Sequence, residues 1–148
     1  MPSTHTCLIY HLIFATKNRE PVIAAEWRSR LHEYLGGAVR GLDGISQGVG
    51  GVADHVHLLV GLKPTHCVSD FMRALKKSSS IWVSETIGLH GFHWQEGYAA
   101  FTVSASARAT VQKYIADQEE HHRVKSFREE LIEFLKKSEI PFDEKYLD

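Results

Sequence analysis

Apolar residues fall in runs that predict a strand and a helix at the start of the chain. Residues 7–16 (CLIYHLIFAT) are mostly aliphatic or aromatic, which is typical of a buried central strand. The polar residues 17–21 then predict a turn. Over residues 25–40 large apolar side chains recur at helical spacing, and Gly41 is placed to end that helix.

A hairpin and a second helix are predicted next. The glycine-rich segment 45–52 and the segment 55–62 are joined by the short connection Ala53-Asp54, which favours two adjacent antiparallel strands. From 68 to 83 apolar residues again recur at helical spacing and predict a long amphipathic helix, which the glycines that follow would close.

A last strand and a further helix complete the predicted domain. Residues 94–104 have the aromatic and small side chains of a strand, and Ser104 or Ser106 could cap a helix running to about Arg123. The order strand, helix, strand, strand, helix, strand is that of the ferredoxin-like split βαβ fold. We therefore expect an α+β protein, with an antiparallel βαββαβ sheet and helices on one face.

The C-terminal segment predicts a helical extension. Ser126 and Glu129 fit a capping box that opens a helix through Lys137, and the tail after it carries apolar residues that we expect to dock. We interpret residues 1–125 as one domain and residues 126–148 as an extension packed on it.

Composition and charge narrow the class of protein. At 148 residues one domain with an ordinary core is expected, and no apolar run is long enough to span a membrane. The N-terminus lacks the features of a signal peptide, and Cys7 and Cys67 do not suggest a disulfide framework, so a cytoplasmic location is the default expectation. The net charge of −1 gives no support for a nucleic-acid partner, so local basic clusters would have to bind a polyanion.

Two histidines on one predicted strand are the first candidate for chemistry. Side chains alternate along a strand, so His55 and His57 share a face while Val56 points the other way. Two imidazoles on one face can bind a divalent cation, and an open site of this kind is what metal-assisted catalysis requires. The alternative is a pair of surface or hydrogen-bonded histidines, and the pattern alone leaves both possibilities open.

A tyrosine and a glutamine one helical turn apart are the second candidate. Tyr114 and Gln118 share a stripe of the predicted helix. A tyrosine can form a covalent phosphotyrosine, and a glutamine oxygen can ligate Mg²⁺ or Mn²⁺, although packing and solvent exposure are the commoner roles of such residues. His121 and His122 continue this stripe, either as site members or as cations at a helix C-terminus.

The chain resembles the HUH single-tyrosine transposases of the insertion sequence 200/605 type, and especially their REP-associated relatives. HxH within DHVHLLVGLKP (54–64) and YxxxQ within VQKYIADQEEHHR (111–123) carry the resemblance. Further matching stretches are YHLIFATKNREP, FMRALKKSSS, FHWQEGYAAFTVS and the C-terminal tail.

The resemblance implies a metal-dependent endonuclease and strand transferase acting on single-stranded or hairpin DNA. His55, His57 and Gln118 would hold Mg²⁺ or Mn²⁺, and Tyr114 would attack the scissile phosphate to leave a 5′-phosphotyrosine and a free 3′-hydroxyl. Such enzymes are homodimers in which the tyrosine can act in cis or in trans. The basic residues that we expect to position the strand are Lys17, Arg19, Arg73, Lys76 and Lys77.

Two other functions remain open from the sequence. One is a domesticated protein that binds hairpin DNA without transposing it. The other is a metal-dependent phosphohydrolase in which His55 and His57 serve a water nucleophile, which leaves the spacing of Tyr114 and Gln118 unexplained.

Overall fold

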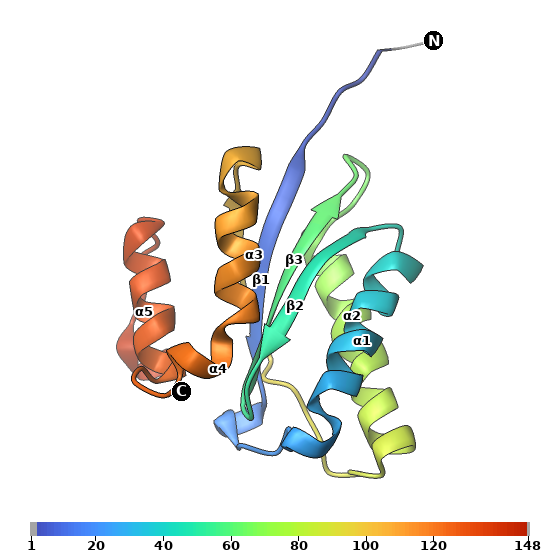
Figure 1. Ribbon diagram of the computed structural model, residues 1–148, viewed down its shortest axis with the longest axis vertical. Helices are drawn as coiled ribbons and strands as arrows, with labels where there is room; N and C mark the ends of the chain where they lie inside the picture. The colour runs from blue at the N-terminus through green and yellow to red at the C-terminus, as the bar shows by residue number, and fades with distance from the viewer. Residues whose placement is uncertain (1–2, 148) are drawn as a thin grey trace.

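A four-stranded antiparallel sheet forms the centre of the molecule (Figure 1). The computed structural model describes residues 3–147. The strands lie in the spatial order β2, β3, β1, β4, which is the antiparallel order of a ferredoxin-like fold. Their bounds are β1 Leu8–Ala15, β2 Ile45–Gly51, β3 His55–Leu62 and β4 Ala99–Val103.

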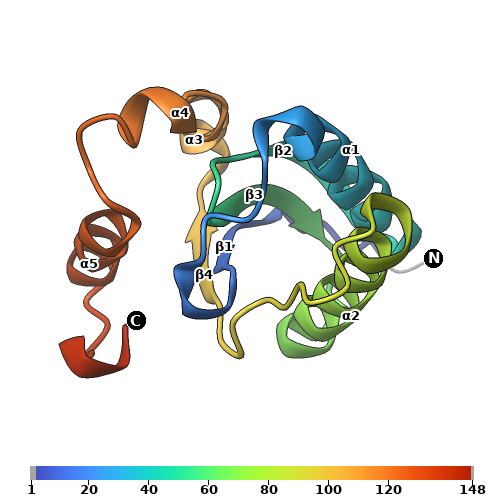
Figure 2. The ribbon, with the colours of Figure 1, turned by 90° about the horizontal axis from the view of Figure 1, so that it is seen from below.

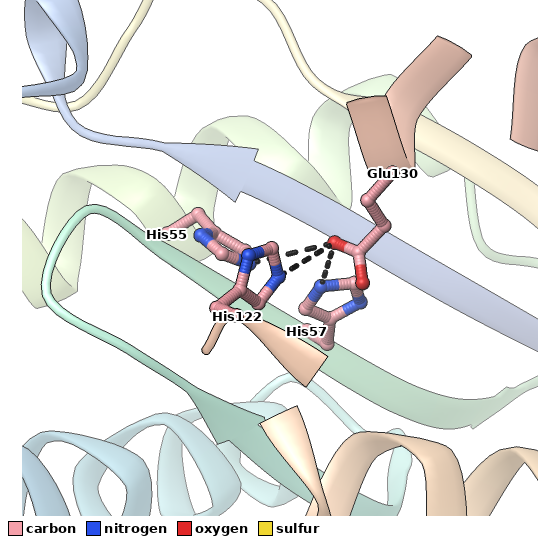
Figure 3. Close-up of side chains that lie close together, drawn as sticks. All are labelled: His55, His57, His122 and Glu130. Atoms are coloured by element: carbon pink, nitrogen blue, oxygen red, sulfur yellow. Dashed lines mark hydrogen bonds and ion pairs between the residues drawn. The ribbon is translucent and has the colours of Figure 1, made fainter. Parts of the chain in front are cut away.

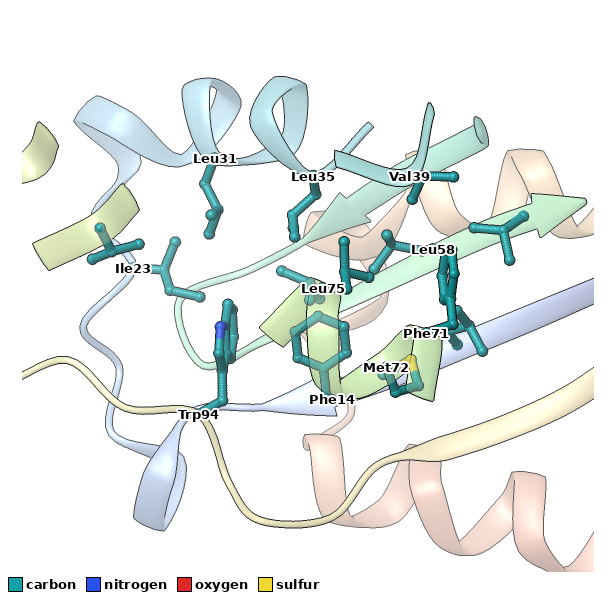
Figure 4. Close-up of a cluster of buried hydrophobic side chains, with 14 of the residues drawn as sticks. Phe14, Ile23, Leu31, Leu35, Val39, Leu58, Phe71, Met72, Leu75 and Trp94 are labelled. Carbon is teal, nitrogen blue, oxygen red and sulfur yellow. The ribbon is translucent and has the colours of Figure 1, made fainter. Parts of the chain in front are cut away.

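Two helices, α1 (Ala25–Gly41) and α2 (Val68–Trp82), cover one face of the sheet, as the sequence predicts (Figure 2). Alternation along the strands directs one set of apolar side chains towards these helices. Phe14, Leu58, Leu35 and Leu75 meet in the resulting core, which Figure 4 shows.

The opposite face of the sheet carries the C-terminal helices (Figure 2). These are α3 (Arg108–Ala116), α4 (Gln118–His121) and α5 (Phe127–Lys137). Ile115 of α3 packs on Ile9 and Leu59, while Phe127 and Leu135 of α5 pack on Ile13 and Phe101. Both sets of contacts bring C-terminal residues directly over β1 and its neighbouring strands.

The close approach of α3 to the sheet depends on a glycine. A Cβ atom added at Gly50 would collide with the carbonyl oxygen of Ile115. The absence of a side chain therefore lets α3 lie against β2. At Gly48, on the same strand, a Cβ would meet its nearest atoms at 3.9 Å, an ordinary contact distance.

Short helical turns connect the main elements. They are a 3-10 turn at Lys17–Arg19, a π turn at Val83–Ile87, and 3-10 turns at Ala105–Ala107 and Glu144–Tyr146. Ser126 accepts a hydrogen bond from the backbone N–H of Glu129, which confirms the expected cap of α5. In the tail, Phe142 and Leu147 pack against the α5 cluster, so the tail docks as expected.

Two predicted boundaries near the last strand and helix are wrong. The strand expected over 94–104 is only Ala99–Val103, because the preceding loop is held by side chains and makes just one bridge, between Thr16 and Trp94. The helix expected to run to Arg123 stops at Ala116, because Asp117 has φ −95° and ψ 20°, outside the helical range. Gln118 then begins α4.

The predicted serine cap is also different in the structure. Ser104 precedes the 3-10 turn but makes no side-chain cap bond, because its hydroxyl is paired with that of Ser106 at 3.1 Å. No helix among the described residues is long and apolar enough to cross a membrane.

Candidate active site

Strand β3 places His55 and His57 on the sheet face that α3 and α5 cover. Both side chains are fully buried, and their ring centroids lie 5.1 Å apart. Val56 and Leu58, which alternate with them, enter the core under α1 and α2. The expected pairing of two imidazoles on one face is therefore present, and it is a buried pair rather than a surface one.

The outer nitrogen of each imidazole has a partner that orients its ring. Nδ1 of His55 lies 2.7 Å from a carboxylate oxygen of Asp54, and Nδ1 of His57 lies 2.7 Å from Nε2 of His11. Metal-binding histidines commonly have such partners, because the outer hydrogen bond fixes the tautomer and the direction of the free nitrogen. Nε2 of both rings consequently points into the site.

Helices α3 and α4 bring Tyr114 and Gln118 to these nitrogens within one chain. Oε1 of Gln118 lies 3.1 Å from Nε2 of His55. The Tyr114 ring centroid is 5.8 Å from that of His57. Gln118 is buried despite the break in the helix before it. The four residues on which the sequence interpretation depends therefore converge at one place.

Glu130, which the sequence interpretation missed, lies at the centre of this group (Figure 3). Its Oε1 atom is 2.9 Å from Nε2 of His57, 3.2 Å from Nε2 of His122 and 3.5 Å from Nε2 of His55. The residue is only 2% exposed. Helix α5 thus carries a buried carboxylate into a ring of three imidazole nitrogens.

The second carboxylate oxygen of Glu130 faces the tyrosine. Oε2 accepts a hydrogen bond from the Tyr114 hydroxyl and another from the Gln118 amide, at 3.2 Å. One glutamate therefore contacts both the histidine cluster and the phenol.

The two adjacent histidines have different positions. His122 joins the cluster, with its ring centroid 4.4 Å from that of His55. The ring of His121 instead packs against the Tyr114 ring at 4.4 Å. Of the two possible site members, His122 offers a nitrogen to the cluster and His121 supports the tyrosine.

Burial and hydrogen bonding set the charges of the cluster. Burial alone would raise the pKa of Glu130, but hydrogen bonds from His122, His55 and His57 outweigh it and hold that pKa well below its usual range. Burial lowers the pKa of His57 to about 4. Burial, together with the Glu130 carboxylate, raises the pKa of Tyr114. At neutral pH the metal-free cluster therefore holds an ionised glutamate beside a protonated phenol.

The donor set fits a divalent metal ion. The ligand atoms of His55, His57, His122 and Glu130 all lie within 4.8 Å of one another. Two atoms that bind one ion at about 2.1 Å can be about 4.2 Å apart, so small side-chain adjustments suffice to place all four around one ion. Imidazole nitrogens with a carboxylate oxygen are a common ligand set for divalent transition metals. The cluster can hold such an ion.

A hollow on the surface borders this cluster at His122. Its volume is about 640 Å³, and Asp54 and His122, which belong to the site, form part of its wall. Arg28, Arg123 and Lys125 line the same hollow. This group of cations was not among the expected basic clusters, and it forms because Arg28 lies in space beside Arg123 and Lys125.

The expected basic residues lie in varied surroundings. The ammonium group of Lys76 is bonded to the carbonyl oxygens of residues 95, 96 and 97 at 2.5, 3.2 and 3.0 Å, so it holds that loop. Arg73 is exposed and pairs with Asp70 at 3.0 Å. Lys17 and Lys77 are exposed, and Arg19 is half-buried. Their contact with DNA stays a prediction.

Sequence signals existed for some of the missed residues. Glu130 follows Phe127 by three positions and precedes Phe134 by four, so it shares the apolar stripe of its helix, where a carboxylate needs a partner. His11 is the polar residue in an otherwise apolar strand, but its contact with His57 depends on the pairing of β1 with β3. No pattern along the chain gives that pairing.

Comparison with known proteins, together with the fold, shows that this protein is a transposase, a DNA-processing enzyme. Residues 4–118 match the family described as "Transposase IS200 like". The ISDra2 transposase TnpA of Deinococcus radiodurans is 34% identical over 126 residues, covering 75% of this chain and 84% of that protein. The transposase of insertion sequence element IS200 from Salmonella typhimurium is 31% identical over 121 residues, covering 78% and 79%. The chain belongs to the IS200-like transposase family.

Solved structures agree on the fold. A crystal structure of a candidate transposase from Deinococcus radiodurans R1 superposes with a TM-score of 0.64 at 31% identity, covering 78% of this chain and 93% of that one. A REP-associated tyrosine transposase bound to a REP hairpin gives a TM-score of 0.55 at 15% identity, covering 78% and 70%. At 15% identity, the similarity to the REP-associated transposase shows a shared fold and nothing more.

Proposed function

We propose that this transposase nicks and rejoins single-stranded DNA through a covalent tyrosine intermediate. The observation that carries the proposal is the convergence, within one chain, of Tyr114 with His55, His57 and Gln118 through their shared partner Glu130.

Tyr114 is the nucleophile in this proposal. Its hydroxyl oxygen attacks the phosphorus of a phosphodiester, the bond from phosphorus to the 3′ oxygen breaks, and a 5′-phosphotyrosine forms. The proton of the phenol passes to the Glu130 carboxylate, which accepts its hydrogen bond, and the departing 3′ oxygen takes up a proton from solvent. Attack by a 3′-hydroxyl reverses these steps and rejoins the strand, because the phosphotyrosine ester retains the energy of the broken phosphodiester bond.

His55, His57 and Gln118 serve as metal ligands in this proposal. A bound Mg²⁺ or Mn²⁺ would supply Lewis-acid polarisation of the phosphate oxygens. Asp54 and His11 hold the two imidazoles so that Nε2 of each faces the site. The burial of both rings limits the access of water that would otherwise compete with the tyrosine.

The substrate is single-stranded DNA with a hairpin. The hairpin-bound relative supports this assignment through its fold, and the hollow lined by Arg28, Arg123 and Lys125 offers cations beside the site for the phosphate backbone. Tyr114 reaches the histidines of its own chain, which favours use of the tyrosine in cis. Assembly as a homodimer stays a prediction.

The test is incubation of the protein with end-labelled hairpin single-stranded DNA and Mn²⁺, read on a denaturing gel. We expect a covalent protein–DNA product that Tyr114→Phe abolishes. Tyr34→Phe, a change in helix α1 on the other side of the sheet, should leave this product intact. DNA retained without cleavage would favour a hairpin-binding protein. Cleavage without a covalent product would favour a hydrolase with a water nucleophile.

A further inference from the structure

Two residues of the cluster lie beyond the part of the chain that matches the family. The match covers residues 4–118, which include His55, His57, Tyr114 and Gln118. His122 and Glu130 come later, from the turn after α4 and from α5. The C-terminal segment therefore adds two potential ligands to the three that the resemblance implies.

We propose that His122 and Glu130 are ligands of the same divalent ion as His55 and His57. This inference rests on the proposed function, and it extends the ligand set to three imidazoles and a carboxylate, with the Gln118 oxygen beside them. Oε1 of Glu130 lies 2.9 to 3.5 Å from all three imidazole Nε2 atoms. Such distances are typical of neighbouring ligands of one ion, whose separation is about 3–4 Å.

The burial of the cluster supports this assignment. Glu130 is 2% exposed, and the side chain of His122 is 10% exposed. A buried carboxylate is costly unless a charged or hydrogen-bonding group compensates it. In the metal-free protein the Nε2–H groups can donate to Glu130. When a metal ion binds, the proton on Nε2 is lost, the ring carries its remaining proton on Nδ1, and Nε2 becomes a ligand beside the carboxylate.

Helix α5 is anchored so that it can hold this carboxylate in place. Phe127 and Leu135, on either side of Glu130 in the sequence, are buried against Ile13 and Phe101. Oε2 of Glu130 remains directed at the Tyr114 hydroxyl. Glu130 would thus bind the ion through one oxygen and position the nucleophile through the other.

This ligand set has a consequence for metal preference. Mg²⁺ prefers oxygen ligands, whereas imidazole suits divalent transition metals. Three imidazoles favour Mn²⁺, Co²⁺ or Zn²⁺ over Mg²⁺ at this site. The expected order of affinity is therefore Zn²⁺ and Co²⁺ first, then Mn²⁺, with Mg²⁺ weakest.

Metal titration of the full chain tests the proposal without any activity assay. Mn²⁺ affinity is measured by calorimetry, and the visible spectrum of bound Co²⁺ reports its coordination. Glu130→Gln and His122→Asn should each lower Mn²⁺ affinity by about tenfold or more and change the Co²⁺ spectrum. Glu133→Gln on the exposed side of α5 and His90→Asn, which changes an exposed histidine away from the site, should leave both unchanged. Circular dichroism of the metal-free variants confirms that they are folded.

The variant His55→Ala distinguishes failure of the two added ligands from failure of the whole metal site. If His55→Ala weakens Mn²⁺ binding while Glu130→Gln and His122→Asn do not, the two added ligands are overturned and the proposed metal site stands. Tighter binding in Glu130→Gln would likewise overturn them, because the carboxylate would then be blocking the site. If His55→Ala also has no effect, the metal site of the proposed function fails as well.

Discussion

Tyr114 donates its hydroxyl hydrogen bond to Glu130, a residue of a different helix sixteen positions later in the chain. The same carboxylate accepts from His57 through its other oxygen. A phenol and a buried imidazole are thereby connected through one side chain, and the C-terminal helix becomes part of the site rather than an appendage to the domain.

The orientation of His55 by Asp54 leads to a first prediction. Asp54→Asn should weaken Mn²⁺ binding by about tenfold, because it weakens the outer hydrogen bond that holds Nε2 of His55 towards the site. The matched control is Asp70→Asn, which removes an exposed carboxylate at the start of α2. Equal affinities of Asp54→Asn and the unchanged protein, measured by calorimetry, would show that this contact does not support the metal site.

The buried histidines lead to a prediction on pH. Burial lowers the pKa of His11 to about 3, and that of His57 and of His32 to about 4. A histidine whose pKa is lowered by folding stabilises the protein above the unfolded pKa near 6.5, and this stabilisation is lost as the pH falls towards the folded pKa. Burial would lower the pKa of His55 as well, but the hydrogen bonds that its ring donates to the carboxylates of Asp54 and Glu130 outweigh burial and raise that pKa. His55 therefore acts in the opposite direction.

Folding lowers the pKa of three histidines and raises that of one, so acid should destabilise the metal-free protein. We expect its free energy of unfolding to fall by roughly 2 kcal/mol between pH 7 and pH 5.5. Glu130, whose pKa is lowered, adds a further loss as the pH falls below its unfolded pKa. Urea denaturation in the presence of a chelator measures the effect. A free energy that stays constant or rises over this interval would contradict the assigned protonation states.

The contact between β2 and α3 gives a prediction on packing. Gly50→Ala should destabilise the fold by about 1–3 kcal/mol, because the new methyl group forces α3 away from the sheet. Gly48→Ala on the same strand should change the free energy of unfolding by no more than about 1 kcal/mol, since its Cβ has room. Because α3 carries Tyr114, Gly50→Ala should also reduce covalent product formation. Similar denaturation curves for the two variants would refute the close contact.

Lys76 and Lys77, neighbours on α2, allow a comparison of two matched variants. Lys76→Met should cost about 1–3 kcal/mol of stability, because three carbonyl oxygens of the loop 95–97 lose their donor. Lys77→Met should lie within about 0.5 kcal/mol of the unchanged protein, since Lys77 is exposed. Thermal denaturation distinguishes the two, and an equal response would mean that Lys76 does not hold the loop.

Local patterns predicted much of this molecule. Strand β3 begins at His55 and ends at Leu62 as expected, because its alternation and its flanking turn are local features. The same alternation correctly predicted that the side chains of His55 and His57 lie on one face of the sheet. The capping box gave the start of α5 at Phe127, since a cap is encoded within four neighbouring residues.

The contacts that the sequence did not predict depend on packing between distant segments of the chain. Gln118 follows a break in the helix, yet its side chain still lies 3.1 Å from Nε2 of His55, a contact between segments 63 residues apart in the sequence. The contact of His11 with His57 requires the register of β1 against β3. Glu130 enters the site only because α5 folds back over β1 and β4, and no spacing along the chain encodes that return.

The most direct measurement of the central claim is to locate the covalent bond. After incubation with hairpin single-stranded DNA and Mn²⁺, the protein is digested with nuclease and protease, and the peptides are analysed by mass spectrometry. We predict a nucleotide phosphate attached to Tyr114, and none on the other tyrosines. A nucleotide on a different residue, or DNA cleaved with every tyrosine unmodified, would contradict the account.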